Sequence, residues 1–558
     1  PYTYRYDLNY CTFNYSMSWW QWDRWQREID WMALNGINMP LAITGQNIIW
    51  QRVYKSLGFT DKDLATFFSG PAYFNWFWMG NIDGWGGPLP QSFMDNQETL
   101  QKQILKRERE LGMTPILPAF TGHVPPAFKT KFPNAKLKKT NWQGFPDVYI
   151  LDPDDEMFTA IGKKFINEEI KTFGTDHLYS ADTFNENTPP TNDSLYLNDV
   201  SKKVYQSMAG ADPKATWIMQ GWMFSYSVKF WQPKQIKALL NAVPDDHMIV
   251  LDLYSESKPV WNKTQAYYGK PWIWCMLHNF GGNISLYGRM KNIANDPADA
   301  LNNQKSGKML GIGLTPEAIE QNPVMYELML ENVWRDKPIE LDPWLKDYAF
   351  RRYGKKDSHA EAAWIILKNT VYNGGISSGG PESIITGRPT FAASTRWANT
   401  KKFYQPKDLV PAWQHLIQAA QNLKASQGFR YDLVDVTRQV LANYADTLQR
   451  QFAAAAKKHD QQSFKKLSNE FLGVIDDLDK LLLTRNDFLL GRWLEAAKAN
   501  GKTEAEKRLY EFNARDQITL WGDKNSPLND YACKQWAGML TGFYKPRWIH
   551  FFDYINAN

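Results

Sequence analysis

The alternation of short β-like runs with helical patterns, from residue 9 to about residue 335, is the feature that most constrains the fold. Each run holds eight or nine residues rich in apolar, β-branched and aromatic side chains, and amphipathic segments separate most of the runs. This order argues for parallel strands joined by helical crossovers. The eight candidate strands are 9–16, 36–43, 113–120, 177–184, 216–223, 248–255, 272–280 and 310–317.

Eight β/α units of this kind predict an α/β fold, a closed TIM-type (β/α)8 barrel that we assign to residues 1–339. Two long connections, 58–96 and 121–153, enlarge it beyond the usual ~250 residues. Long insertions of this kind tend to build binding sites, so we expect both near the functional site. The segment between the sixth and seventh candidate strands has the weakest helical pattern.

Beyond about residue 340 the β-type alternation disappears, and strong helix formers with an apolar residue every three or four positions replace it. Residues 431–460 and 461–485 are the clearest examples. We therefore assign residues 340–558 to an all-α helical C-terminal domain. The Gly/Ser/Pro-rich stretch at 372–391 interrupts it, and we expect that stretch to cover the barrel mouth.

Charge and cysteine content argue against several classes of partner. The 64 basic and 59 acidic residues leave a net charge of only +5, too diffuse for a nucleic-acid surface. No apolar stretch approaches the ~18 residues of a membrane span. Cys11, Cys275 and Cys533 lie far apart without metal-ligand spacing, so we expect no metal, no cofactor and no disulfide framework.

Aromatic residues are unusually abundant, with 25 Trp, 27 Tyr and 30 Phe. Most of these rings are expected in a large core. Flat rings also form the usual floor for the apolar faces of sugars. The composition therefore favours a carbohydrate partner without establishing one.

Two glutamates stand at the ends of candidate strands. Glu186 follows the fourth strand, where Pro189 and Pro190 forbid its continuation, and Glu317 follows the eighth. In a closed barrel both would reach the same rim, where two carboxyl groups can cleave a glycosidic bond. The alternative is that either glutamate only caps the next helix, and the Thr-Pro before Glu317 fits that interpretation.

Other acids compete for the same role. Asp252 and Glu256 lie at the end of the sixth candidate strand. Asp182 should point to the same side as Glu186 by strand alternation, so it could position or protonate a neighbour. No serine elbow, Cys/His nucleophile pair, HExxH helix, P-loop or dinucleotide fingerprint is present.

Six ordered blocks carry a resemblance to a known family. They are DWMALNGINMPLAITGQNIIWQ, GMTPILPAFTGHVP, FGTDHLYSADTFNE, QGWMF, WIWCMLHNFGG and LTPEAIEQNPVMYEL. Together they resemble the α-N-acetylglucosaminidases, glycoside hydrolase family 89, as a bacterial-type relative of the lysosomal enzyme. Family members usually carry a small α/β domain before the barrel, which this sequence lacks.

The resemblance implies a retaining exo-hydrolase that releases terminal α-linked N-acetylglucosamine from a glycan. It implies Glu186 as acid/base and Glu317 as nucleophile, with carboxyl groups ~5 to 5.5 Å apart. A catalytically inactive, carbohydrate-binding barrel is the alternative. Because the chain does not begin with Met, we expect a longer precursor and a periplasmic, secreted or lysosome-like location. The implied sugar contacts are Asn9, Cys11, Trp142, Asn185, Trp222, His278, Phe280, Trp521 and Tyr531.

Overall fold

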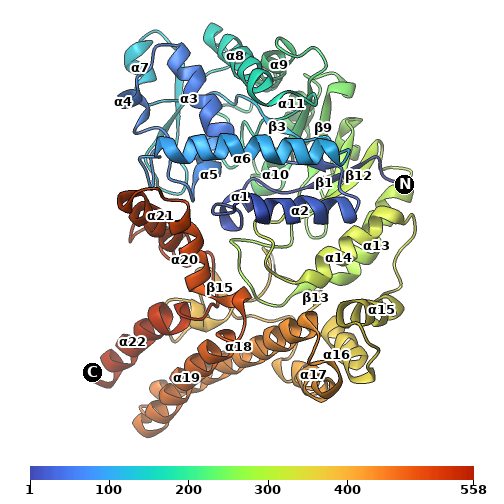
Figure 1. Cartoon of the computed structure of the whole chain (residues 1–558), viewed down its shortest axis with the longest axis vertical. Helices are drawn as coiled ribbons and strands as arrows, with labels where there is room; N and C mark the ends of the chain where they lie inside the picture. The colour runs from blue at the N-terminus through green and yellow to red at the C-terminus, as the bar shows by residue number, and fades with distance from the viewer. Residues whose placement is uncertain (377, 558) are drawn as a thin grey trace.

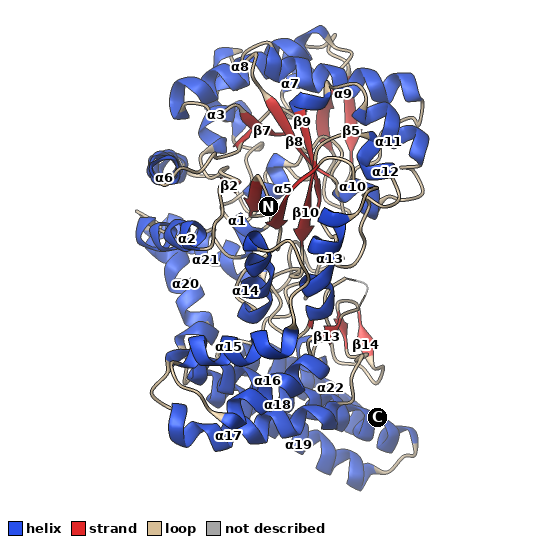
Figure 2. Cartoon of the chain, turned by 90° about the vertical axis from the view of Figure 1, so that its right-hand side faces the viewer, coloured by secondary structure: helices blue, strands red, loops and turns tan. Residues whose placement is uncertain are grey.

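The computed structural model describes residues 1–376 and 378–557. A barrel of strands surrounded by helices forms one half of the molecule, and a group of long helices forms the other (Figure 1). In the turned view the strands lie gathered inside the ring of helices (Figure 2). The predicted fold class, a TIM-type barrel followed by an all-α domain, is confirmed.

Eight parallel strands build the barrel in the spatial order β2-β1-β12-β10-β9-β8-β7-β3. A parallel bridge between Leu41 and Ile116 joins the two ends of this order, so the sheet closes. The strands pair in sequence order around the barrel, as short right-handed crossovers require. Their bounds are β1 Tyr4–Asp7, β2 Met39–Pro40, β3 Leu117–Pro118, β7 Leu178–Ser180, β8 Thr216–Gln220, β9 Met248–Asp252, β10 Trp272–Met276 and β12 Met309–Leu314.

The first candidate strand, 9–16, is wrong. The strand is β1, and residues Thr12–Tyr15 form the short helix α1 instead. The side chain of Asn9 accepts a hydrogen bond from the Cys11 amide, and the Asn9 amide donates to Thr12 Oγ1. Such local side-chain hydrogen bonds favour a turn over the backbone hydrogen bonds of a β-sheet. Asn9 and Cys11 consequently lie in the loop after β1, at the barrel mouth.

Amphipathic helices cover the barrel, and α2 and α6 match the clearest sequence patterns. Asp155 and Asp193 begin α8 and α9 by accepting a backbone N–H, as N-cap residues do. Between β9 and β10 only the short α12, Gln265–Tyr268, is present, where the helical pattern was weakest. The other bounds are α2 Trp22–Leu34, α3 Gln46–Ser56, α6 Gln91–Glu110, α8 Glu156–Phe173, α9 Ser194–Ala209, α10 Trp222–Tyr226, α11 Pro233–Leu240, α13 Met290–Asn302 and α14 Pro323–Glu331.

The two long connections form small structures of their own. The first contains α4, Asp61–Leu64, and the aromatic α5, Phe74–Trp78. The second carries α7, Phe128–Lys131, and a three-stranded antiparallel sheet. That sheet consists of β4 His123–Val124, β5 Leu137–Thr140 and β6 Val148–Leu151.

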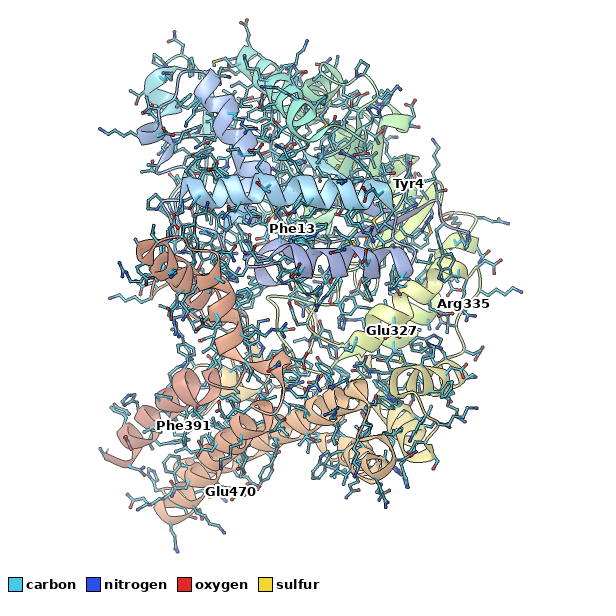
Figure 3. The ribbon with its side chains drawn as sticks, viewed as in Figure 1. Tyr4, Phe13, Glu327, Arg335, Phe391 and Glu470 are labelled. Atoms are coloured by element: carbon cyan, nitrogen blue, oxygen red, sulfur yellow. The ribbon has the colours of Figure 1, made fainter. Side chains whose placement is uncertain are left out.

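Among the described residues, eight α-helices follow the barrel, with α18 and α19 lying side by side as the longest pair (Figure 1). One buried apolar cluster runs from the barrel into α15, α16 and α17, and a second fills the space between α18, α19 and α22. Phe391 packs against Phe551 in this second region (Figure 3). The bounds are α15 Leu341–Tyr353, α16 Ser358–Asn369, α17 Val410–Leu423, α18 Gln427–Lys457, α19 Gln461–Leu482, α20 Leu490–Ala499, α21 Glu504–Gln517 and α22 Lys545–Ala557.

The end of α21 fastens the helical domain to the first insertion of the barrel. Asp516 accepts hydrogen bonds from Tyr73 Oη at 2.5 Å and Trp85 Nε1 at 3.1 Å. Gln517 donates to the Ala72 carbonyl. These bonds hold the segment that begins at Trp521 against the barrel mouth. In the described ranges, no helix combines the length and apolar character that a bilayer span needs.

The domain boundary near residue 339 stays a prediction. The Gly/Ser/Pro-rich stretch of 372–391, apart from residue 377, which lies outside the described residues, includes β13, Asn373–Gly374, which pairs with β11, Gly288–Arg289. A two-stranded hairpin follows it, β14 Ser394–Thr395 and β15 Ala398–Asn399. Ser378 and Trp397 from this region line the cavity at the barrel mouth, where the stretch was expected to lie.

Candidate active site

A cavity of about 290 Å³ opens at the barrel mouth and holds both candidate glutamates. Its walls come from the loops after several strands, from both insertions and from the helical domain. This is the face where TIM barrels carry their active sites. The cavity brings together Glu186 and Glu317 with eight of the nine predicted sugar contacts: Asn9, Cys11, Trp142, Asn185, Trp222, Phe280, Trp521 and Tyr531.

Glu186 lies in the turn that follows β7, the fourth barrel strand. Trp142 Nε1 donates to its Oε2 at 2.7 Å, and Trp222 Nε1 donates to its Oε1 at 3.1 Å. Each indole is a rigid donor without an acceptor function, so the two rings fix the plane of the carboxyl group. The second insertion and the start of α10, which follows β8, therefore orient this side chain.

Glu317 follows β12, the eighth barrel strand, and its Oε2 is held by two donors. The Gly281 amide donates at 2.5 Å, and Tyr531 Oη donates at 2.9 Å from the helical domain. Gly281 has a φ of +63°, and a Cβ there would lie 2.8 Å from the Tyr531 carbonyl, so only glycine fits this turn. Among the described residues, Oε1 accepts no hydrogen bond and stays available to a ligand.

The enclosing walls raise the pKa of both carboxyl groups. For Glu317, burial and then the negative charge of Glu186 raise the pKa to about 7, against the two hydrogen bonds that favour its ionised form. Burial also raises the pKa of Glu186, and the two indole donors oppose that shift. Because each charge disfavours the other, the pair tends to keep one proton between its two carboxyl groups.

Asn9, Cys11 and Asn185 are fixed by local bonds beside the glutamates. Asn9 Nδ2 donates to the Thr315 carbonyl at 3.0 Å, which ties the loop after β1 to the loop that carries Glu317. Asn185 Nδ2 donates to Asp182 Oδ2 at 2.7 Å. Strand β7 ends at Ser180, so Asp182 lies in the turn after it. The prediction that strand alternation directs Asp182 to the same side as Glu186 is therefore wrong.

Aromatic rings wall the cavity on several sides. Trp142 and Trp521 lie with ring centroids 5.5 Å apart, and Trp521 is fully buried. Trp521 Nε1 also donates to Tyr15 Oη at 2.7 Å, so a tryptophan of the helical domain is anchored on α1. Trp222 stacks on Tyr226, which is 46% exposed at the mouth.

His278 is the one predicted contact that the structure does not bring to the cavity. Its ring stacks on Tyr287 at 4.6 Å, and its Nε2 contacts the Asn322 amide. Burial lowers its pKa to about 3, so it is neutral. Phe280 lines the cavity, whereas His278 does not reach its surface.

The competing acids are also absent from the cavity surface. Asp252 accepts backbone N–H bonds from Val260 and Trp261. Glu256 accepts those of Leu277 and His278, and thereby supports the loop after β10. Both carboxylates order loops instead of facing a ligand. In the described ranges, no three His, Cys, Asp or Glu side chains group as metal ligands do.

Sequence reasoning missed more than half of the lining residues. Several lie in the two insertions, whose length alone pointed to the site, and others lie in loops without any distinguishing pattern. The missed residues are Tyr15, Trp76, Met79, Asn81, Gln143, Gln220, Ser225, Tyr226, Leu253, Lys258, Leu277, Ser378, Trp397 and Leu528.

Comparison with known proteins agrees with this architecture. Residues 5–336 match the family model of the alpha-N-acetylglucosaminidase TIM-barrel domain, and residues 344–558 match the C-terminal domain model of that family. The human protein named alpha-N-acetylglucosaminidase is 43% identical over 562 residues, which cover 99% of this chain and 75% of the human one.

Two solved structures of a family 89 glycoside hydrolase from Clostridium perfringens superpose over 100% of this chain. The complex with PUGNAc has a TM-score of 0.94 at 33% identity. The complex with substrate GlcNAc-alpha-1,4-galactose has a TM-score of 0.93 at 33% identity. The chain spans 64% and 63% of the lengths of these two solved chains, just under two thirds.

Proposed function

The chain belongs to the α-N-acetylglucosaminidase family of glycoside hydrolases, and from that membership we propose that it releases terminal α-linked N-acetylglucosamine with retention of configuration. The observation that carries the proposal is the convergence of Glu186 and Glu317 on one cavity, from loops that are far apart in the sequence. Two carboxyl groups flanking one bound sugar are what glycoside hydrolysis requires.

The stereochemistry of the substrate calls for a nucleophile from the protein. In an α-linked N-acetylglucosaminide the 2-acetamido group is cis to the leaving oxygen and cannot attack the anomeric carbon from behind. Glu317 suits this role because Gly281 and Tyr531 hold Oε2 and leave Oε1 free. Attack by Oε1 breaks the glycosidic bond and forms a covalent β-glycosyl ester.

Glu186 then acts as the acid and later as the base. For this step the one proton of the pair must lie on Glu186 and the negative charge on Glu317, although burial raises the pKa of both groups, so that Glu186 can give its proton to the leaving oxygen. The resulting Glu186 carboxylate takes a proton from water, which attacks the ester and releases the sugar in its original α configuration. Retention predicts that the two carboxyl groups stand ~5 to 5.5 Å apart.

The shape of the cavity favours removal of one terminal sugar. A volume of about 290 Å³ between the Trp142, Trp521 and Phe280 rings accommodates a single residue, and aromatic faces suit its apolar side. The partner is therefore a glycan that ends in α-linked N-acetylglucosamine. The alternative, an inactive sugar-binding barrel, has no support from the site, since neither carboxyl group is displaced or blocked.

Release of free N-acetylglucosamine from 4-nitrophenyl N-acetyl-α-glucosaminide tests the proposal. We expect turnover of this compound, no turnover of its β-anomer, and the α-anomer as the first product seen by proton NMR. Sugar binding without release would support the inactive barrel. A first product of β configuration would exclude the double displacement.

The pH dependence follows from the shared proton of the pair. Hydrolysis requires one carboxyl ionised and one protonated, so kcat/KM should be bell-shaped. At low pH both carboxyls are protonated and no nucleophile exists; because burial raises both pKa values, the acid limb should lie above the ordinary glutamate value. The alkaline limb, where the pair loses its last proton, should also lie above the ordinary glutamate value, because burial raises the pKa of both groups and the charge of Glu186 adds to the shift that brings the pKa of Glu317 to about 7.

A pH series of kcat/KM with the aryl substrate measures both limbs. Glu186→Gln should lose the alkaline limb, because an activated leaving group needs no acid. An alkaline limb that persists in this variant would contradict the assignment of the shared proton to Glu186 and Glu317.

A further inference from the structure

The amide of Asn185, next to the acid/base, is held in one orientation. Its Nδ2 donates to Asp182 Oδ2 at 2.7 Å and also contacts Met79 Sδ. Its carbonyl oxygen, in contrast, accepts no hydrogen bond from any described residue. Asn185 lines the cavity with 8% of its surface exposed, so the unpaired carbonyl oxygen is the polar atom that it can offer to a ligand.

Asp182 decides this orientation without touching the cavity. It is 4% exposed and does not line the cavity, whereas Asn185 and Met79 do. Its Oδ2 takes the NH2 end of the neighbouring amide, and this hydrogen bond favours the ionised carboxylate against the burial that raises the pKa of Asp182 to about 7. Met79 Sδ, a weak acceptor, contacts the same NH2 end of the amide.

Asn185 lies next to Glu186 and lines the same cavity, so it can reach the groups close to the anomeric carbon. In the proposed mechanism Glu186 protonates the glycosidic oxygen. That oxygen is attached to the anomeric carbon. Carbon 2 is the neighbour of the anomeric carbon, so the residue next to Glu186 is well placed for the substituent on carbon 2. In N-acetylglucosamine this substituent presents an N–H, which can donate but cannot accept.

We infer that Asp182 is a positioning residue that makes Asn185 present a hydrogen-bond acceptor to the N–H of the 2-acetamido group. This inference rests on the proposed function and assigns to it a specificity device. A hydroxyl at carbon 2 both donates and accepts, so it gains nothing from the fixed orientation. Asp182 therefore favours 2-acetamido sugars over their 2-hydroxy counterparts.

Asp182→Asn tests the orientation with a side chain of nearly equal shape. The new NH2 group can donate to Asn185 Oδ1, which turns the Asn185 amide around and points its own NH2 at the sugar. Two donors then face each other when an acetamido sugar binds, but a 2-hydroxyl can accept. Because a neutral amide replaces a buried acid, we expect the variant to fold, which a melting curve checks.

The readout is the ratio of two dissociation constants measured by calorimetry. The probes are 2-acetamido-1,2-dideoxynojirimycin and 1-deoxynojirimycin, which differ at carbon 2. Asp182→Asn should lower the preference for the acetamido probe about 10- to 100-fold, the usual effect of one mispaired buried polar group. The loss should come from weaker binding of the acetamido probe, with the hydroxy probe nearly unchanged.

A double substitution provides the rescue. In Asp182→Asn with Asn185→Asp, the carboxylate at 185 again presents an acceptor while the amide at 182 donates to it. The preference for the acetamido probe should return toward that of the unsubstituted protein. Asp252→Asn is the matched control, since Asp252 is also buried at a strand end but accepts hydrogen bonds from the Val260 and Trp261 amides away from the cavity, and it should leave the ratio unchanged.

Three results would overturn the inference: equal weakening of both probes in Asp182→Asn, an unchanged ratio, or no recovery in the double variant. If Asp182→Asn does not fold, Met79→Leu must lower the preference on its own, by about threefold or more. An unsubstituted protein that binds neither probe and hydrolyses no α-N-acetylglucosaminide would instead refute the proposed function.

Discussion

Glu317→Ala is expected to lower kcat on the aryl α-glycoside by at least ~10⁴-fold, because the double displacement has no other nucleophile. The Oε1 atom that we propose as the attacking group disappears, and neither Tyr531 nor Gly281 can replace it. Steady-state release of 4-nitrophenol measures the loss. Removal of a buried carboxyl group that is costly to ionise should leave the melting temperature equal or higher.

Azide distinguishes a lost nucleophile from a damaged site. In Glu317→Ala the small anion can occupy the space below the sugar and attack from that face, which gives the β-glycosyl azide. Glu320→Ala is the matched control. Glu320 lies three residues further along the same loop and is exposed, so this variant should keep near-normal turnover. Residual activity of Glu317→Ala above about one per cent without azide would remove Glu317 from the mechanism.

Glu186→Gln should produce a loss that depends on the leaving group. With a disaccharide, whose leaving oxygen needs a proton, kcat/KM should fall by about 10³-fold or more. With an activated aryl glycoside, the first step should continue at a much smaller loss, and the glycosyl-enzyme should accumulate. Comparison of kcat/KM for the two substrates in the same variant measures the difference.

With Glu186→Gln, azide should give the anomer opposite to the one that it gives with Glu317→Ala. It attacks the β-glycosyl-enzyme from the face that Glu186 normally serves, so the α-glycosyl azide forms and turnover of the aryl substrate rises. The two variants thus identify the two roles by the configuration of one product. An equal loss on both substrates, without an effect of azide, would mean that Glu186 only supports the fold.

Much of the fold could be predicted because its patterns are local. Seven of the eight candidate strands overlap a strand of the barrel, and the helices α2, α6, α18 and α19 follow their apolar stripes. The first strand was misplaced because side-chain bonds from Asn9 and Thr12 turned an alternating stretch into a helical turn. Such competition between turn and strand is decided by a few polar atoms that periodicity does not record.

The two glutamates were found because a strand end in a barrel has a known place in space. The cavity walls were not found, since Tyr15 on α1, Trp76 on α5 and Trp397 in the hairpin reach the site only through tertiary contacts that no sequence pattern records. His278, a sugar contact that the resemblance implies, stacks on Tyr287 and does not line the cavity, so its role stays a prediction. Its direction depends on a backbone φ of +56°, which the sequence does not reveal.

The hydroxyl that steadies Glu317 belongs to Tyr531, more than two hundred positions downstream and in the other half of the molecule. The barrel is consequently not a portable catalytic module. A protein engineer who joins the barrel to a foreign domain, or ends the chain before Tyr531, would keep Glu186 and Glu317. The hydrogen bond from Tyr531 that holds Glu317 would be lost. The two halves have to be inherited and redesigned as a single reactive unit.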